Sequence, residues 1–125
     1  MRIATMGFVS GLLKESTGQR CEFMRVNGKL PETYWTWEYM ETPSMTSTEN
    51  GYQETTIIVR GFTSGEWLTL EEGKERIEKA CAKTAILNDG TGVAVFYDSA
   101  MVVPTGDAQL KSIKINLIVQ EWKVN

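Results

Sequence analysis

The sequence predicts an α+β domain in which a mostly antiparallel sheet carries two helices packed on one face. Two segments repeat their apolar residues at the spacing of a helix, one at residues 4–16 and one that begins at Thr69. Four longer segments have the alternating or β-branched composition of strands, at 33–40, 52–62, 93–103 and 110–124. This order is typical of a domain with segregated helices, and no linker or repeat divides residues 1–125.

The first expected helix, residues 4–16, is indicated by apolar pairs such as Phe8 and Leu12, which lie four positions apart. Gly18 follows at the position where a left-handed residue commonly closes a helix. Two glycines inside the segment each cost about 1 kcal/mol relative to alanine. Because the intrinsic propensity is weak, packing has to hold this helix, and we expect it to dock on the sheet.

The next two segments predict strands joined by a turn. Residues 21–26 alternate loosely and Asn27-Gly28 is a turn dipeptide, so this stretch predicts a short strand that leads into a hairpin. Residues 33–40 are rich in aromatic and β-branched side chains, which favour a strand. One face of that strand carries Trp35, Trp37 and Tyr39 and is the better candidate for the core; the other carries Tyr34, Thr36 and Glu38.

The middle of the chain predicts a loop, a long strand and the second helix. Residues 41–51 are polar and end in Asn-Gly, which predicts a loop or a projecting hairpin tip, and the apolar run within 52–62 predicts a long strand. Thr69 precedes Glu72 by the spacing of a capping box, so we expect the helix to begin there. Apolar residues recur at helical spacing as far as Thr84, while charged residues take the other face.

Two further strands complete the expected sheet. A turn cluster at 88–92 leads into the strand at 93–103, and a polar loop precedes the last strand, 110–124. Apolar residues alternate with polar ones in that last strand; they are Ile113, Ile115, Leu117 and Val119. Trp122 has the opposite parity, which predicts a bulge near the end of the strand or a different surface that Trp122 covers.

Composition excludes several functional classes. The chain has 13 basic and 16 acidic side chains, a net charge of −3 and no histidine. Without imidazole, Ser-His-Asp and Cys-His catalysis and histidine-containing zinc sites are excluded. The negative net charge argues against general binding to the phosphates of nucleic acid, and no sequence-specific nucleic-acid partner is expected. No apolar run approaches the length of a membrane span, and no membrane partner is expected.

No spacing of residues predicts a catalytic, metal or cofactor site. Cys21 and Cys81 have no neighbours at metal-ligand spacing, which indicates free, buried thiols. The candidate acids have no base, nucleophile or ligand partner at a recognisable spacing; they are Glu38, Glu41, Glu54, Glu66, Asp89, Asp98 and Asp107. We therefore expect a protein that is not an enzyme and that has no catalytic residue, bound metal or cofactor.

The aromatic residues of the 33–40 strand leave an alternative function open. If Trp35, Trp37 and Tyr39 were exposed, their flat rings could stack on a sugar or pack on a peptide. A domain of this size also needs tryptophan for its core. The first alternative is therefore a carbohydrate- or peptide-binding module that uses this aromatic strip, set against an interpretation in which the strip is core.

One arrangement of segments resembles a known family. Residues 30–39 read Leu-Pro-Glu-Thr-Tyr-Trp-Thr-Trp-Glu-Tyr, and a polar loop, the strand at 53–60, a glycine break and a capped amphipathic helix follow. Pro31, Tyr34 and Thr36-Trp37 form a pattern of proline, aromatic and Thr-aromatic residues, and a long strand ends the chain. This order resembles the tail-terminator, or tail-completion, proteins of long-tailed bacteriophages.

The resemblance implies a structural protein. Members of that family form a hexameric ring that caps the completed tail tube and presents a surface to the head-side connector. It implies three partners: other copies of the chain in a homo-hexamer, the tail tube protein and the head-completion or connector protein. It also implies a place in the virion at the tail-head junction, after synthesis in the bacterial host cytoplasm. Another phage neck or connector subunit with the same architecture is the second alternative.

Two polar loops flanked by long strands are the candidate protein contacts. They span Pro43 to Tyr52 and Pro104 to Leu110. A ring closes when one patch meets a different patch on the next subunit, and loops that project from both ring faces would meet its neighbours. The residues singled out are Pro43, Met45, Asn50, Tyr52, Pro104, Asp107 and Gln109.

Overall fold

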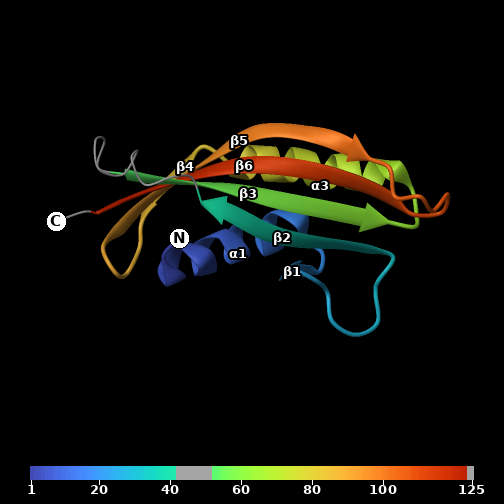
Figure 1. The fold of residues 1–125 in the computed structure, drawn as a ribbon, viewed down its shortest axis with the longest axis horizontal. Helices are drawn as coiled ribbons and strands as arrows, with labels where there is room; N and C mark the ends of the chain where they lie inside the picture. Colours follow the sequence, from blue (N-terminus) through green and yellow to red (C-terminus); the bar gives the residue numbers. More distant parts are fainter. Residues whose placement is uncertain (42–51, 124–125) are drawn as a thin grey trace.

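The computed structural model describes residues 1–41 and 52–123, which contain two helices and one six-stranded sheet (Figure 1). In chain order the elements are α1 (Ile3–Thr17), β1 (Cys21–Phe23), β2 (Thr33–Glu41), β3 (Tyr52–Thr63), α3 (Trp67–Ala80), β4 (Lys83–Ile86), β5 (Thr91–Val103) and β6 (Lys111–Lys123). The strand order across the sheet is β1-β2-β3-β6-β5-β4. Only β1 and β2 are parallel among these neighbours. The expected fold class is confirmed.

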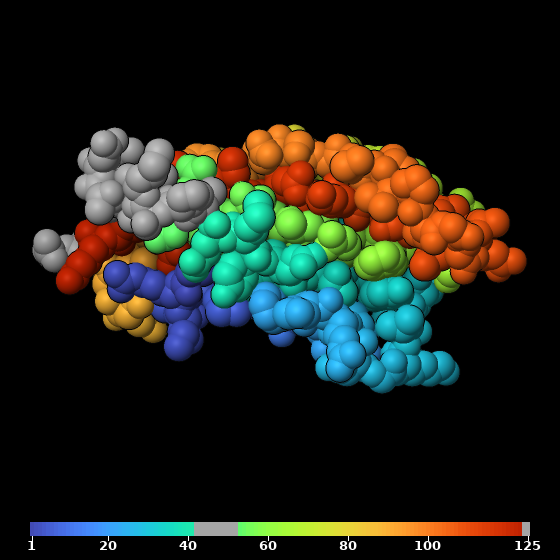
Figure 2. All heavy atoms as spheres, viewed as in Figure 1, coloured from blue at the N-terminus to red at the C-terminus, as the bar shows by residue number. Residues whose placement is uncertain are grey.

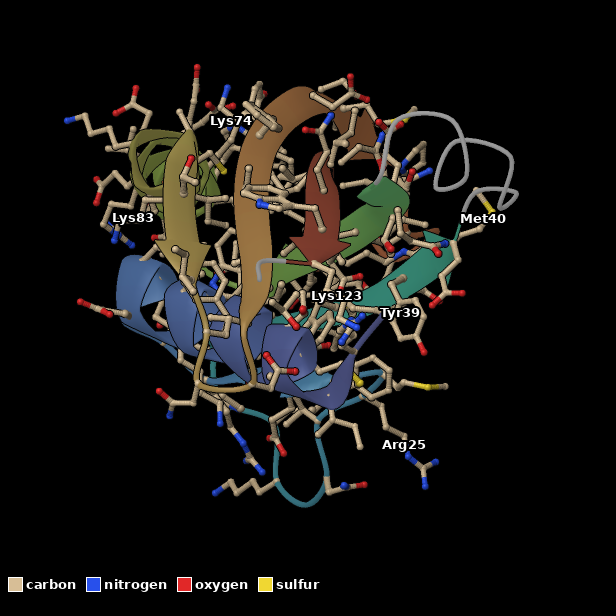
Figure 3. The ribbon with its side chains drawn as sticks, turned by 90° about the vertical axis from the view of Figure 1, so that its left-hand side faces the viewer. Arg25, Tyr39, Met40, Lys74, Lys83 and Lys123 are labelled. Atoms are coloured by element: carbon tan, nitrogen blue, oxygen red, sulfur yellow. The ribbon has the colours of Figure 1, made fainter. Side chains whose placement is uncertain are left out.

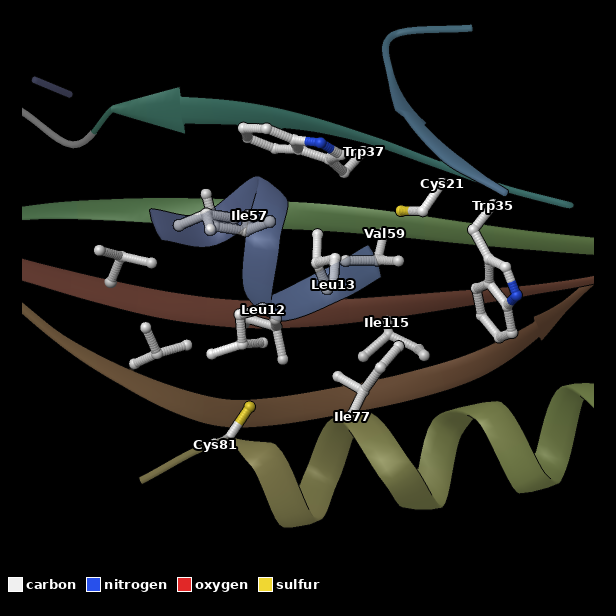
Figure 4. Close-up of a cluster of buried hydrophobic side chains, with 14 of the residues drawn as sticks. Leu12, Leu13, Cys21, Trp35, Trp37, Ile57, Val59, Ile77, Cys81 and Ile115 are labelled. Carbon is white, nitrogen blue, oxygen red and sulfur yellow. The ribbon is translucent and has the colours of Figure 1, made fainter. Parts of the chain in front are cut away.

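Both helices pack on one face of the sheet, because the strands turn an alternating apolar row to that side. Val59 of β3 and Ile115 of β6 are partners in register and are fully buried. Leu13 of α1 and Ile77 of α3 are buried in the same cluster (Figure 4). In the part of the chain that the structure describes, no helix is long and apolar enough to cross a membrane.

The two ends of α1 are held in different ways. Gly18 follows the helix with a left-handed φ of 62°, which closes it as expected. At the other end, Glu121 of β6 acts from a distant part of the chain. Its buried carboxylate accepts hydrogen bonds from the Thr5 hydroxyl (2.6 Å) and the Arg2 backbone N–H (3.0 Å). A negative charge at a helix N-terminus is favourable, so the last strand anchors the start of the first helix.

The expected hairpin at residues 21–28 is wrong. β1 is three residues long and runs parallel to β2. The chain leaves the sheet at Met24, whose φ is 69°, and returns to β2 through a wide loop. The Arg20 guanidinium holds this loop by donating to the carbonyl oxygens of Asn27 and Lys29. Parallel neighbours need a connection that runs back along the strand, and a turn dipeptide inside that connection does not reveal its length.

The second helix begins before the expected capping box. α3 starts at Trp67, and the preceding Glu66 makes no capping hydrogen bond through its side chain. Thr69 lies inside the first turn, where its N–H donates to the Glu66 carbonyl oxygen (3.1 Å). The Trp67 indole N–H donates to Glu71 Oε1 one turn later (3.1 Å). The expected start at Thr69 is therefore wrong. The hydrogen bond between Trp67 and Glu71 takes the place of the expected capping box.

The helix also ends earlier than Thr84, and the sequence did not predict β4. The Cys81 N–H donates to the Ile77 carbonyl oxygen (3.1 Å), which completes the last turn. Ala82 then has a left-handed φ of 62°, and its N–H donates to the Val95 carbonyl oxygen (2.6 Å). That bond brings the chain alongside β5 and starts the short edge strand.

β6 keeps its alternation to its end, with Glu121 as the last buried inward residue. Trp122 lies on the opposite face, where its ring covers Gly92 of β5 so closely that a Cβ on the glycine would overlap it. The expected bulge near the end of β6 is wrong, and the alternative that Trp122 covers a different surface is confirmed. The register shift occurs in β5, between Tyr97 and Ser99.

Candidate functional site

The connection between β5 and β6 contains three of the predicted contact residues, Pro104, Asp107 and Gln109. The Thr105 hydroxyl accepts a hydrogen bond from the Asp107 N–H (3.1 Å) and donates to the Leu110 carbonyl oxygen (2.8 Å). Asp107 Oδ1 accepts from the Gln109 backbone N–H (2.9 Å). Asp107 therefore shapes the turn, while the exposed side chain of Gln109 is left for a partner.

A hollow of about 380 Å³ lies beside this turn. Its walls come from the start of α3, the end of β5 and the turn; they include Trp67, Val102, Val103, Pro104, Ala108 and Leu110. The walls are mostly apolar, and Leu68 stands exposed on the same end of α3. Such a hollow can receive an apolar side chain of a partner protein. The sequence alone does not predict this hollow, because Trp67 and the turn are far apart in the chain.

The second predicted contact loop falls mostly outside the described residues, which is where Pro43, Met45 and Asn50 lie. Tyr52 is the first residue of β3, with its backbone in register with Trp122. The strand ends that flank residues 42–51 lie at one end of the sheet, and the β5–β6 turn lies at the other (Figure 1). The two predicted loops are therefore not brought together.

The aromatic strip of β2 is largely core. Trp35 is 0 % exposed and Trp37 is 2 % exposed, so neither indole face is open to a ligand. The Trp35 indole N–H donates to Gln19 Oε1 (2.8 Å), which satisfies its polar atom inside the fold. Tyr39 reaches the surface beside Phe23, with 6.1 Å between the ring centroids. The core interpretation of the two tryptophans is confirmed, and a sugar-stacking platform made of all three rings is wrong.

The candidate acids are dispersed and mostly engaged in structure. Glu38 forms an ion pair with Arg60 across two strands, and Glu41 forms one with the N-terminal amine. Asp89 accepts a hydrogen bond from the Thr91 backbone N–H (3.0 Å), and hydrogen bonding by Thr91 lowers the pKa of the Asp89 carboxyl. Within residues 1–41 and 52–123, no three acidic, cysteine or histidine side chains are close enough together to hold a metal ion.

Both cysteines are free and buried, as the sequence predicted. They lie on different sides of the core cluster (Figure 4). Burial raises the pKa of the Cys21 thiol to about 12 and that of Cys81 to about 11. Neither thiol is ionised near neutral pH, so neither has the reactivity of a catalytic cysteine.

Comparison of the whole fold with solved structures gives two informative likenesses. A chain from the virion of a native gene transfer agent particle matches with a TM-score of 0.69 and 15% sequence identity, over 87% of this chain and 83% of that one. A second solved protein, of no stated function, matches with a TM-score of 0.69 and 10% identity, over 98% of this chain and 93% of its own. The arrangement of helices and strands is therefore shared with a virion component. No protein-family model and no curated protein matches the sequence.

Proposed function

We propose that this chain is a structural subunit of a phage-type virion and that it acts as a tail terminator. In this role a homo-hexameric ring sits on the end of the tail tube, stops its growth and joins it to the head connector. The work is done by surface matching, without catalysis or a cofactor. The observation that carries the proposal is the fold likeness to the gene transfer agent virion chain, which extends over most of both chains.

Two features of the structure support the terminator role in particular. The strand ends that flank residues 42–51 and the β5–β6 turn lie at opposite ends of the sheet (Figure 1), so contacts with the tail tube and with the connector could be made at different ends. The β5–β6 turn is braced by its own hydrogen bonds and has an apolar hollow beside it. A braced turn loses little conformational entropy on docking, which favours a specific protein contact.

Electron microscopy of the purified protein mixed with tail tubes tests the proposal. Annular particles should form at one end of the tubes, and their mass should be a hexamer of the 14.1 kDa chain. Removing the gene should give tails of irregular length that do not join heads. Normal tails on heads without the gene would contradict the role. Binding to the head connector but never to tubes would indicate the alternative of another neck subunit.

A single charge change tests the β5–β6 turn as the docking site. Gln109 contributes only its backbone N–H to the turn, so Gln109→Lys should leave the fold and its unfolding temperature unchanged while it weakens docking. Asn88→Lys is the matched control, because it adds the same charge to an exposed turn between β4 and β5. Equal docking of Gln109→Lys and wild type would remove this turn from the contact.

A further inference from the structure

The outer edge of β5 is open over most of its length. β4 pairs with β5 only from Gly92 to Val95. In the described part of the chain, no strand pairs with the outer side of β5 from Phe96 to Val103. Three apolar side chains are exposed along this stretch; they are Phe96, Met101 (56 %) and Val102 (64 %). Unpaired strand edges with exposed apolar residues are surfaces on which another chain can dock.

The same edge carries negative charge. Asp98 is exposed at the register shift of β5, and a bulge with a charge at an edge discourages indiscriminate strand pairing. On α3, Glu71 is paired with Lys74 (3.2 Å), so Asp98 supplies the charge of this edge. We call residues 96–102 the acidic edge.

The opposite edge of the sheet carries positive charge and a second apolar set. The loop after β1 contains Arg25 and Lys29 and no acidic residue between them. Phe23, Met24 and Leu30 are exposed there. Figure 3 shows Arg25 projecting away from the fold, on the side opposite Lys74. We call residues 23–30 the basic loop, whose shape is held by hydrogen bonds from the Arg20 guanidinium to backbone carbonyl oxygens.

We propose that the basic loop of one copy docks on the acidic edge of a second copy of this chain. The two surfaces have opposite charge, and both offer exposed apolar side chains that association would bury. The two surfaces lie on opposite edges of the same sheet. In Figure 2 the basic loop is the light-blue to cyan segment at the bottom, and β5 is the orange strand at the top. Each copy therefore carries one of each, as a head-to-tail contact requires, and such contacts form a ring when the rotation between copies closes.

This inference rests on the proposed ring and names the contact between its subunits. It also explains how the open edge of β5 can be tolerated in a free subunit. Asp98 opposes pairing with a chance neighbour, yet it attracts the positively charged Arg25 of another copy. Because these charges are solvent-exposed, the association should weaken as ionic strength rises.

Cysteine cross-linking tests the contact without requiring a stable ring. Two variants, Asn27→Cys in the basic loop and Ser99→Cys in the acidic edge, are mixed in equal amounts under mild oxidation. Both positions keep the charges that carry the proposal, and the native cysteines are buried. The disulfide-linked heterodimer should exceed its statistical share. The control mixture of Asn88→Cys with Ser99→Cys should give only that share. Equal yields from the two mixtures would overturn the contact.

Charge-reversal substitutions, added to the Asn27→Cys and Ser99→Cys variants, provide a second test of the contact. Arg25→Glu alone and Asp98→Lys alone should each lower the heterodimer yield, in line with a loss of affinity of about tenfold or more. Combining both substitutions in each copy should restore it. Lys123→Glu is the matched control, because its exposed charge at the end of β6 belongs to neither surface. No loss in either single variant would overturn the charge pairing.

Electron microscopy of the same variants separates this inference from the ring itself. Annular particles that form normally from the Arg25→Glu variant would overturn the proposed contact and leave the proposed function in place. If wild-type protein forms no annular particle, alone or with tail tubes, the proposed function fails and the inference fails with it.

Discussion

Replacement of Gly73 by alanine tests how closely α3 packs on the sheet, through its effect on the free energy of unfolding. The Trp35 indole lies between Gly73 of α3 and Gly61 of β3, and a Cβ on either glycine would overlap atoms of the ring. The indole is fully buried and its N–H is bonded to Gln19, so it has little room to move aside. Neither glycine has a left-handed φ, so backbone conformation does not require glycine at these two positions. What requires it is the absence of a Cβ, which leaves room for the Trp35 ring.

Two opposing effects decide the magnitude. Alanine is favoured over glycine in a helix interior by about 1 kcal/mol, so propensity alone predicts that Gly73→Ala stabilises the protein. Forcing extra volume into a packed core costs about 1–3 kcal/mol, and the upper value applies here because Gly61 blocks the ring on its other side. We expect a net loss of about 2 kcal/mol in the free energy of unfolding.

Gly11→Ala is the matched control, because Gly11 lies within α1 and a Cβ there would meet nothing within 4 Å. It should raise the free energy of unfolding by about 1 kcal/mol, so the two variants should differ by about 3 kcal/mol. Urea unfolding followed by tryptophan fluorescence gives both values.

A double-mutant cycle identifies the clash. In a Trp35→Phe background the outer indole atoms are missing, so the penalty of Gly73→Ala should largely disappear. A Gly73→Ala protein as stable as wild type would refute the packing argument. An equal penalty in the Trp35→Phe background would also refute it.

Further predictions concern α1, the helix pair and the thiols. Glu121→Ala should lower the free energy of unfolding in urea by about 2 kcal/mol, because the buried Thr5 hydroxyl and the part-buried Arg2 N–H at the start of α1 lose their shared carboxylate acceptor. Arg76→Ala should cost about 1 kcal/mol in the same assay, since its guanidinium donates to two carbonyl oxygens at the end of α1 (2.8 and 3.0 Å), whereas Lys79→Ala should be neutral. The raised pKa values of Cys21 and Cys81 favour the protonated thiol in the folded state. Their contribution to stability should be complete below pH 9.0 and should be lost as the pH rises towards about 11 and 12. Urea unfolding across this range, with Cys→Ser variants that remove the effect, checks it; a pH dependence unchanged in those variants would contradict it.

The long elements could be predicted from the sequence because their signals are local. In β6 the apolar residues recur every second position, and this alone identifies a strand with one buried face. In α1 the pair Phe8 and Leu12 and the following Gly18 locate the helix to within a residue or two. Trp35 and Trp37 share the buried face of β2 as expected.

The candidate site could be predicted only in part. The polarity of Pro104–Leu110 marks it as a loop, and the structure confirms a turn there. The hollow beside it depends on Trp67, which reaches the turn only after α3 packs on the sheet. The open edge of β5 has no local signal at all, because whether a strand is an edge depends on where β4 stops pairing.

The sequence by itself therefore determined the class of fold, the two helices, the four long strands and the inward faces of β2 and β6. Residue spacing decides these features, since side chains repeat every two residues in a strand and every 3.6 in a helix. The tertiary structure decided the parallel position of β1, the presence of β4, the anchoring of α1 by Glu121 and the exposure of the two sheet edges. Each of these depends on contacts between residues far apart in the chain, which local spacing does not encode.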